Sequence, residues 1–163
     1  MFIHSVAFIT KQKMEGERQL NSCIGKSLAK GKIQSFILEG EMSDLINVTF
    51  LYFDTWIKIV SADEITSVIK ENHSIDKITH YGDKDFYYPI NLIELHFPKI
   101  KSYYGKTLLR WKELVLLKDT SMSYGINLYF DDDMNFIIHN QAYPIDKNQY
   151  LFTNTIPKDL IEK

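Results

Sequence analysis

The residues whose types and spacing best suit catalysis are His80 and Asp83, three positions apart in the polar stretch 72–84. A histidine beside a carboxylate is the pairing that general acid–base catalysis uses. The stretch is expected to be a loop, where such pairs also occur as ordinary solvated side chains. The pair is the best catalytic candidate in the chain, and it does not by itself identify an enzyme.

The histidines and the acidic runs do not predict a metal site. The five histidines lack the four-residue spacing that places two imidazoles on one ion. Asp131, Asp132 and Asp133 offer carboxylate oxygens, but the spaced ligands and distant glutamate of a calcium loop are missing. Aspartate also suits turns and keeps a hairpin tip soluble. We expect no metal and no cofactor.

Motifs of the large enzyme classes are also missing. The chain contains no phosphate-binding glycine loop, dinucleotide fingerprint, nucleophile elbow or zinc-protease helix. One open alternative is a small-ligand binder or enzyme that uses a pocket between sheet and helices. Another is a nucleic-acid binder, because basic and aromatic residues are interleaved between residues 99 and 112. The basic residues of that alternative are Lys99, Lys101, Arg110 and Lys112. A pI of about 6.2 makes nucleic acid the less favoured partner.

Acidic residues are concentrated in two blocks. Residues 33–71 carry seven acidic and two basic groups, and residues 119–163 carry seven and three, although the net charge of the chain is only -2. Each block contains one copy of the sequence Leu-Tyr-Phe-Asp, at 51–54 and at 128–131. The repeat is open to two interpretations, internal duplication and coincidence.

Both copies lie where the pattern predicts a β-hairpin. In the stretch 124–140, YGINLYFDDDMNFIIHN, apolar and polar residues alternate on both sides of an acidic turn. We predict antiparallel pairing of residues 124–130 with 136–138, and of 45–53 with 56–60. Residues 33–39 and 108–118 are predicted to be the first strands of these two meanders. Residues 148–154 are expected to add an edge strand.

Helices are predicted in three places. Residues 15–30 have the apolar spacing of an amphipathic helix. Its stripe consists of Leu20, Cys23, Ile24 and Leu28. Cys23 is therefore expected to be buried and unreactive. A capping box at Ser61 and Glu64 predicts a short helix after residue 61. A third helix is expected between Pro89 and Pro98, and the segment 2–9 is predicted to be a strand.

These elements predict a single α+β domain over residues 1–163. Its core would be a mainly antiparallel β-sheet built from two three-stranded meanders, with helices packed on one face. A length of 163 residues with 45% hydrophobic composition suits one ordered domain. The lone cysteine and the lack of a signal peptide or a membrane-spanning apolar run favour a cytoplasmic protein without membrane contact.

In character the chain resembles the immunity proteins that bacteria pair with contact-dependent and other polymorphic toxins, and the unit 124–140 carries the resemblance. The resemblance implies a complex with a cognate toxin domain, often a basic nuclease, whose active site or substrate surface is covered. We therefore predict a binding protein rather than an enzyme. The surface expected to bind the partner is an acidic hairpin edge with aromatic anchors. Its residues are Glu39, Glu41, Asp44, Asp54, Tyr129, Asp131, Asp132, Asp133 and Tyr143.

Overall fold

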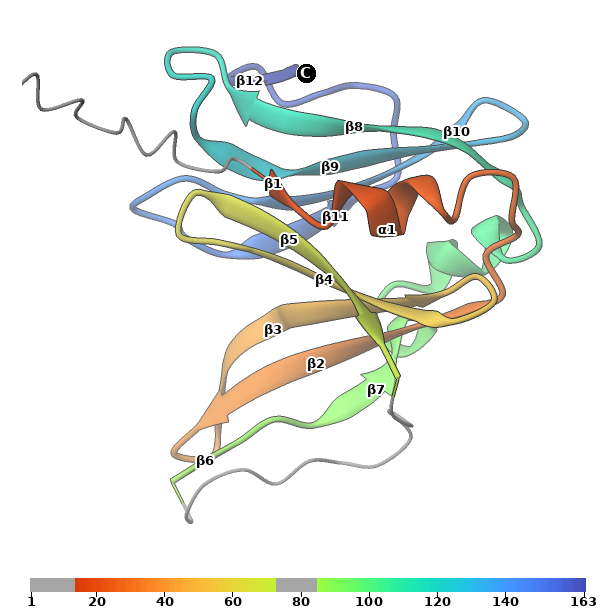
Figure 1. Cartoon of the computed structure of the whole chain (residues 1–163). Coiled ribbons are helices and arrows are strands. Elements are labelled where there is room, and N and C mark those ends of the chain that lie inside the picture. The colour runs from red at the N-terminus through yellow and green to blue at the C-terminus, as the bar shows by residue number, and fades with distance from the viewer. Residues whose placement is uncertain (1–13, 73–84) are drawn as a thin grey trace, which may run out of the picture.

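The computed structural model describes residues 14–72 and 85–163. In this part of the chain, two β-sheets pack face to face (Figure 1). Residues from both sheets contribute to one large hydrophobic cluster between them. The predicted strand at 2–9 and the catalytic candidates His80 and Asp83 lie outside the described residues.

The first sheet is built around an antiparallel meander of four strands. These are β2 (Lys30–Leu38), β3 (Glu41–Tyr52), β4 (Trp56–Ala62) and β5 (Ile65–Glu71). A short strand β1 (Met14–Glu15) pairs parallel to β5. The other side of β2 pairs with β6 (Phe86–Tyr87) and β7 (Ile90–Leu92).

The second sheet contains another antiparallel meander of four strands. These are β8 (Leu108–Leu116), β9 (Ser123–Phe130), β10 (Met134–Asn140) and β11 (Asn148–Leu151). The last strand, β12 (Leu160–Glu162), pairs with the free side of β8, so the sheet order is β11-β10-β9-β8-β12. Both predicted hairpins are confirmed, since β3 pairs antiparallel with β4 and β9 with β10. The predicted edge strand is confirmed as β11.

The predicted α+β fold is wrong, because the described residues form a two-layer β-structure. The helices here are α1 (Glu17–Asn21) and two 3₁₀ segments, η1 (Ile93–Leu95) and η2 (Pro98–Tyr103). Each is too short to cover a sheet face. The two meanders form separate sheets whose apolar faces cover one another. A second sheet, and not the predicted layer of helices, therefore covers the apolar face of each sheet.

Glycines explain why the predicted helix at 15–30 is reduced to five residues. Gly16 and Gly25 have φ angles of 84° and 87°, in the left-handed region that an α-helix does not use. The Gly25 N–H donates to the Leu108 carbonyl instead of to a helical acceptor. Ile24 of the predicted stripe is 43% exposed, whereas Cys23 is buried as predicted.

The helix predicted after residue 61 is instead a hairpin between β4 and β5. Asp63 and Glu64 both have positive φ angles, 53° and 64°, which is the two-residue turn that matches the twist of paired strands. The Ser61 hydroxyl bonds across the hairpin to the hydroxyl of Thr66, 3.1 Å away, rather than capping a helix. The helix expected between Pro89 and Pro98 is likewise wrong, because β7 and η1 occupy that stretch.

The two Leu-Tyr-Phe-Asp copies meet in the core. Their leucines and phenylalanines belong to the cluster between the sheets, and the rings of Phe53 and Phe130 are nearly parallel with centroids 6.5 Å apart. The tyrosines lie outside this cluster, each beneath a cation from the neighbouring strand. Lys30 Nζ is 5.1 Å from the ring centroid of Tyr52, and the Arg110 guanidinium carbon is 4.1 Å from that of Tyr129.

Of the helices in residues 14–72 and 85–163, none has the length and apolar composition needed to cross a membrane.

Candidate functional site

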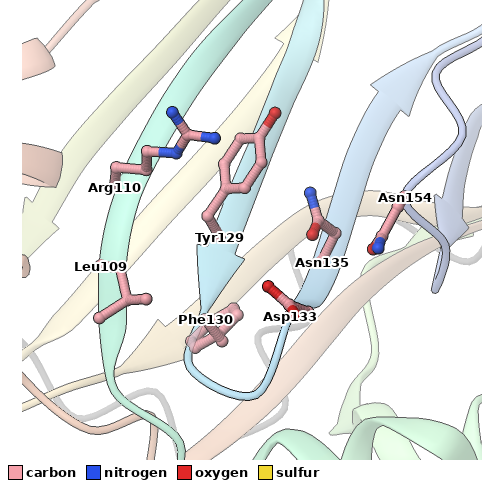
Figure 2. A pocket seen from close by; sticks show the side chains of 7 residues that line it. All are labelled: Leu109, Arg110, Tyr129, Phe130, Asp133, Asn135 and Asn154. Carbon is pink, nitrogen blue, oxygen red and sulfur yellow. The ribbon is translucent and has the colours of Figure 1, made fainter.

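A polar pocket lies on the second sheet near the β9–β10 turn (Figure 2). Arg110 of β8, Tyr129 of β9 and Asn135 of β10 are in register, so their side chains form a row across three strands on one face. Asp133 of the turn and Asn154 lie beside this row. The cavity measures about 340 Å³. We call it the outer pocket, lined by Leu109, Arg110, Tyr129, Phe130, Asp133, Asn135 and Asn154.

Neighbouring contacts hold the row in place. Arg110 stacks on the Tyr129 ring, and the Tyr129 hydroxyl donates to the Glu162 carboxylate. Burial, and then this hydrogen bond to a carboxylate, raise the pKa of Tyr129 to about 12, so the hydroxyl keeps its proton at neutral pH. The amide nitrogen of Asn135 donates to the Asn127 side-chain oxygen at 3.0 Å. The Asn135 side chain is therefore fixed, as is its buried partner.

The three aspartates of the predicted acidic tip have different surroundings. The Asp131 carboxylate accepts the backbone N–H of Thr107 at 3.1 Å. Asp132 forms an ion pair with Lys106. Asp133 lines the outer pocket. The tip is thus a turn anchored to the neighbouring segment, with part of its charge neutralised.

Of the other predicted acidic residues, Asp54 lies at the same end as this tip, and Glu39, Glu41 and Asp44 do not. Asp54, in the turn between β3 and β4, lies at the end of the sandwich that holds the tip, and it pairs with Lys26 at 2.6 Å. Glu39 and Glu41 flank the β2–β3 turn at the opposite end of β3 (Figure 1). Asp44 follows them on β3, where its carboxylate accepts the Ile46 N–H. Burial raises the pKa of Asp44, and that hydrogen bond opposes the shift.

Tyr143 lies at the same end as Asp44, in the loop between β10 and β11. The side chain of Tyr143 is 91% exposed, and Ile145 in the same loop is 56% exposed. The β4–β5 turn lies next to this loop (Figure 1), and a hollow of about 200 Å³ is shared between them. Its lining comprises Asp63, Glu64, Tyr124, Asn140, Tyr143 and Asp146. Two exposed apolar side chains thus adjoin a group of carboxylates.

We call this surface the acidic end, consisting of Asp44, Asp63, Glu64 and Asp146 around the loop Tyr143–Ile145. Two charged neighbours act on the pKa of Asp44: Lys147 lowers it, and Asp146 raises it. All three side chains therefore lie close together. The acidic end therefore combines residues from β3, the β4–β5 turn and the β10–β11 loop.

Comparison with known proteins returned no match. No family model, curated protein or solved structure that was searched matches the chain.

The basic residues of the nucleic-acid alternative are divided between two elements. Lys99 and Lys101 belong to η2, whereas Arg110 and Lys112 belong to β8. Lys99 Nζ donates to the Phe152 carbonyl at 3.3 Å, and Arg110 stacks on Tyr129. The aromatic residues between them are not free to stack on bases, because Tyr103 is buried and Tyr104 and Trp111 pack against the core.

Sequence reasoning found Tyr129, Asp133 and Tyr143 but missed several of their neighbours. Asn135 could have been found, because period-2 alternation places it on the same face as Tyr129 once β9 and β10 pair. Asp63 and Glu64 were interpreted as part of a helix start, so their place in a turn was missed. Asn154 and Asp146 carry no local signal, since they reach these surfaces only through the sheet topology.

Proposed function

We propose that this protein is a protein-binding module that holds a basic partner at the acidic end, as an immunity protein holds its toxin. The observation that carries the proposal is the exposed loop Tyr143–Ile145. A tyrosine that is 91% exposed beside a 56% exposed isoleucine contributes little to folding. Tyrosine is among the residues that most often dominate the energy of protein interfaces.

The partner's chemistry follows from what surrounds the loop. Carboxylates of Asp63, Glu64 and Asp146 border the hollow beside Tyr143. A partner with an apolar depression ringed by lysine or arginine would receive the tyrosine ring and meet these charges. Complementary charge of this kind speeds association more than it increases affinity.

The other acidic residues of the predicted binding surface are divided between the two ends of the molecule. Glu39 and Glu41 lie at the β2–β3 turn, at the end of β3 opposite Asp54. Asp54 and Asp132 each pair with a lysine at the opposite end. The acidic end surrounds the exposed loop Tyr143–Ile145, which makes it the better candidate for meeting a basic protein. The hairpin tip is the alternative that the experiment must separate from it.

The partner is first isolated by affinity capture from the source cells, using the unaltered chain and a Tyr143→Ser, Ile145→Ser variant. The matched control is Leu95→Ser, because Leu95 is 66% exposed in η1, away from the loop. We expect a basic protein to be retained by the unaltered chain and by the control but lost by the loop variant. Retention by all three would contradict the proposal.

Association rates with the isolated partner then test the charges. A triple variant Asp63→Asn, Glu64→Gln, Asp146→Asn is compared with Asp131→Asn, Asp132→Asn, Asp133→Asn, which makes the same change in charge at the other end. We expect the first to slow association at low salt and much less at high salt, since the Debye length falls from about 10 Å at 0.1 M to about 3 Å at 1 M. Slowing by the second alone would assign the interface to the hairpin tip.

The immunity function is tested separately by growth. The partner, expressed alone, should arrest the cells, and co-expression of the unaltered chain should restore growth. Co-expression of the loop variant should not. A partner that is harmless alone would leave protein binding in place and refute the immunity function.

A further inference from the structure

We propose that the outer pocket binds a small zwitterion of the amino-acid class, with its carboxylate on Arg110 and its ammonium group on Asp133. This inference is independent of the proposed protein interface, because the outer pocket lies beside the β9–β10 turn and the acidic end lies at the opposite end of the second sheet.

The outer pocket contains two opposite charges that remain available to a ligand. In the described part of the chain, neither the Arg110 guanidinium nor the Asp133 carboxylate has an ion-pair partner, although both line the same cavity. Arg110 is exposed and its guanidinium lies over the face of the Tyr129 ring, so its N–H donors remain available to a ligand. The cavity thus has a positive group and a negative group that do not neutralise each other (Figure 2).

Hydrogen bonds and ring stacking order several side chains of the pocket wall. Arg110 is held 4.1 Å from the centroid of Tyr129, and the Tyr129 hydroxyl is bound to Glu162. Asn135 is 5% exposed and is bound to Asn127, which is itself fully buried. Side chains that are already ordered lose less conformational entropy when a ligand binds. The Arg110 side of the pocket is therefore ordered before a ligand binds, and the exposed Asp133 carboxylate lies beside it.

The two charges of the pocket define the class of ligand that it can bind. A guanidinium presents paired N–H donors that match a carboxylate, and a carboxylate accepts the hydrogen bonds of an ammonium group. A volume of about 340 Å³ is sufficient for an amino acid. The Asn154 amide adds a polar contact, and Leu109, which is 53% exposed, offers an apolar one. A ligand with only one charge would leave the opposite group of the pocket without a partner.

The test is titration followed by NMR of the Arg110 Nε–H and of the side-chain amides of Asn135 and Asn154. The zwitterionic probes are L-alanine and γ-aminobutyrate, and the matched single-charge probes are butyrate and butylammonium. We expect at least one zwitterion to shift these signals at millimolar concentration, and the single-charge probes to bind at least about tenfold more weakly. Equal binding of butyrate, or no shift with either zwitterion, would overturn the proposal.

Variants of the pocket complete the test. Arg110→Gln and Asp133→Asn should each weaken binding of the zwitterion about tenfold or more, because each removes one charged hydrogen bond. Asparagine tolerates the positive φ of position 133, 54°, so the turn should be kept. The control is Lys112→Gln, on the same strand outside the pocket lining. Unchanged binding in both pocket variants, with the fold intact by circular dichroism, would also refute the site.

Discussion

The stack between Phe53 and Phe130 is expected to couple the two sheets energetically. Phe53 belongs to the β3–β4 turn of the first sheet and Phe130 to β9 of the second. Their rings are inclined by only 7° and are 7% and 2% exposed, so both are enclosed between the sheets. Replacing a buried phenylalanine with alanine typically costs about 3–5 kcal/mol, a large share of a total stability of about 5–15 kcal/mol. Leucine is the better substitution, because it keeps the position apolar and the chain folded.

The expected magnitudes follow from burial and ring geometry. Phe53→Leu and Phe130→Leu should each lower the free energy of unfolding by about 1–3 kcal/mol. The double variant should lose less than the sum of the two, by about 0.5–1.5 kcal/mol, since the aromatic contact can be lost only once. The free energies are measured by urea unfolding followed by far-ultraviolet circular dichroism.

A second double-mutant cycle, made with two phenylalanines that do not touch, provides the control. Phe36 packs against Phe86 and Tyr88 in the first sheet and has no contact with Phe130. Phe36→Leu combined with Phe130→Leu should therefore be additive within about 0.5 kcal/mol. Additivity in the Phe53–Phe130 cycle as well would refute the claim that this contact couples the sheets.

Three further predictions concern single positions. Gly125→Ala should destabilise the protein by about 3 kcal/mol or more, because φ is 139° and the added Cβ would lie 2.1 Å from the Ile138 carbonyl oxygen. Gly40→Ala, which has open space around it, should cost only about 1 kcal/mol. Equal losses of stability in thermal unfolding would contradict this prediction. Burial lowers the pKa of His139 below its ordinary value of 6.5. Its contribution to stability is therefore complete above pH 6.5 and is lost as the pH falls towards the folded-state pKa. His139→Gln should remove this part of the pH dependence of unfolding, whereas His96→Gln, at an exposed position, should not. Cys23 is 1% exposed and burial raises its pKa, so a thiol reagent should label it only as fast as the native structure opens, and rapid labelling would disprove this.

The strands could be predicted because their signal is local. In β9, Ile126, Leu128 and Phe130 alternate with side chains of the opposite face, and the acidic turn comes where the alternation stops. Each of these features needs only a few consecutive residues. The pairing of β9 with β10 therefore followed from the sequence, and it fixes which side chains share a face.

The layering could not be predicted in the same way. An apolar sheet face must be covered, but the alternation is the same whether helices or a second sheet cover it. The predicted helix around Leu20 exists, but it is only the five-residue α1. The left-handed conformations of Gly16 and Gly25 limit its length on both sides. Gly25 binds the distant Leu108 carbonyl, and Gly16 lies so close to the Val68 backbone that a side chain there would clash. These contacts are distant in sequence, so their effect could not be predicted from the local pattern.

The candidate surfaces show the same division. Tyr129 and Asp133 were found because they belong to one hairpin. The acidic end draws Asp44, Asp63 and Asp146 from three segments that are far apart in sequence. A count of charge along the chain located acidic blocks but could not show that lysines neutralise part of one end and that the other end surrounds an exposed tyrosine.

The repeated Leu-Tyr-Phe-Asp sequence is best explained by equal structural demands on two hairpins. In each copy the leucine and phenylalanine point into the shared core and the tyrosine lies outside it under a basic side chain. Each aspartate also contacts a segment beside its hairpin: Asp54 pairs with Lys26, and Asp131 accepts the Thr107 N–H. These two segments are joined to each other by a β-bridge between Ser27 and Thr107.

The registers of the two hairpins differ, however, by one residue. In the first, Tyr52 pairs with Trp56 and the phenylalanine begins the loop, whereas in the second Phe130 itself pairs with Met134 and the loop is Asp131–Asp133. A copied hairpin would be expected to keep its register, because a slip of one residue exchanges the two faces of the following strand. The register difference therefore favours coincidence over duplication, with the core selecting the same inward residues from both sides.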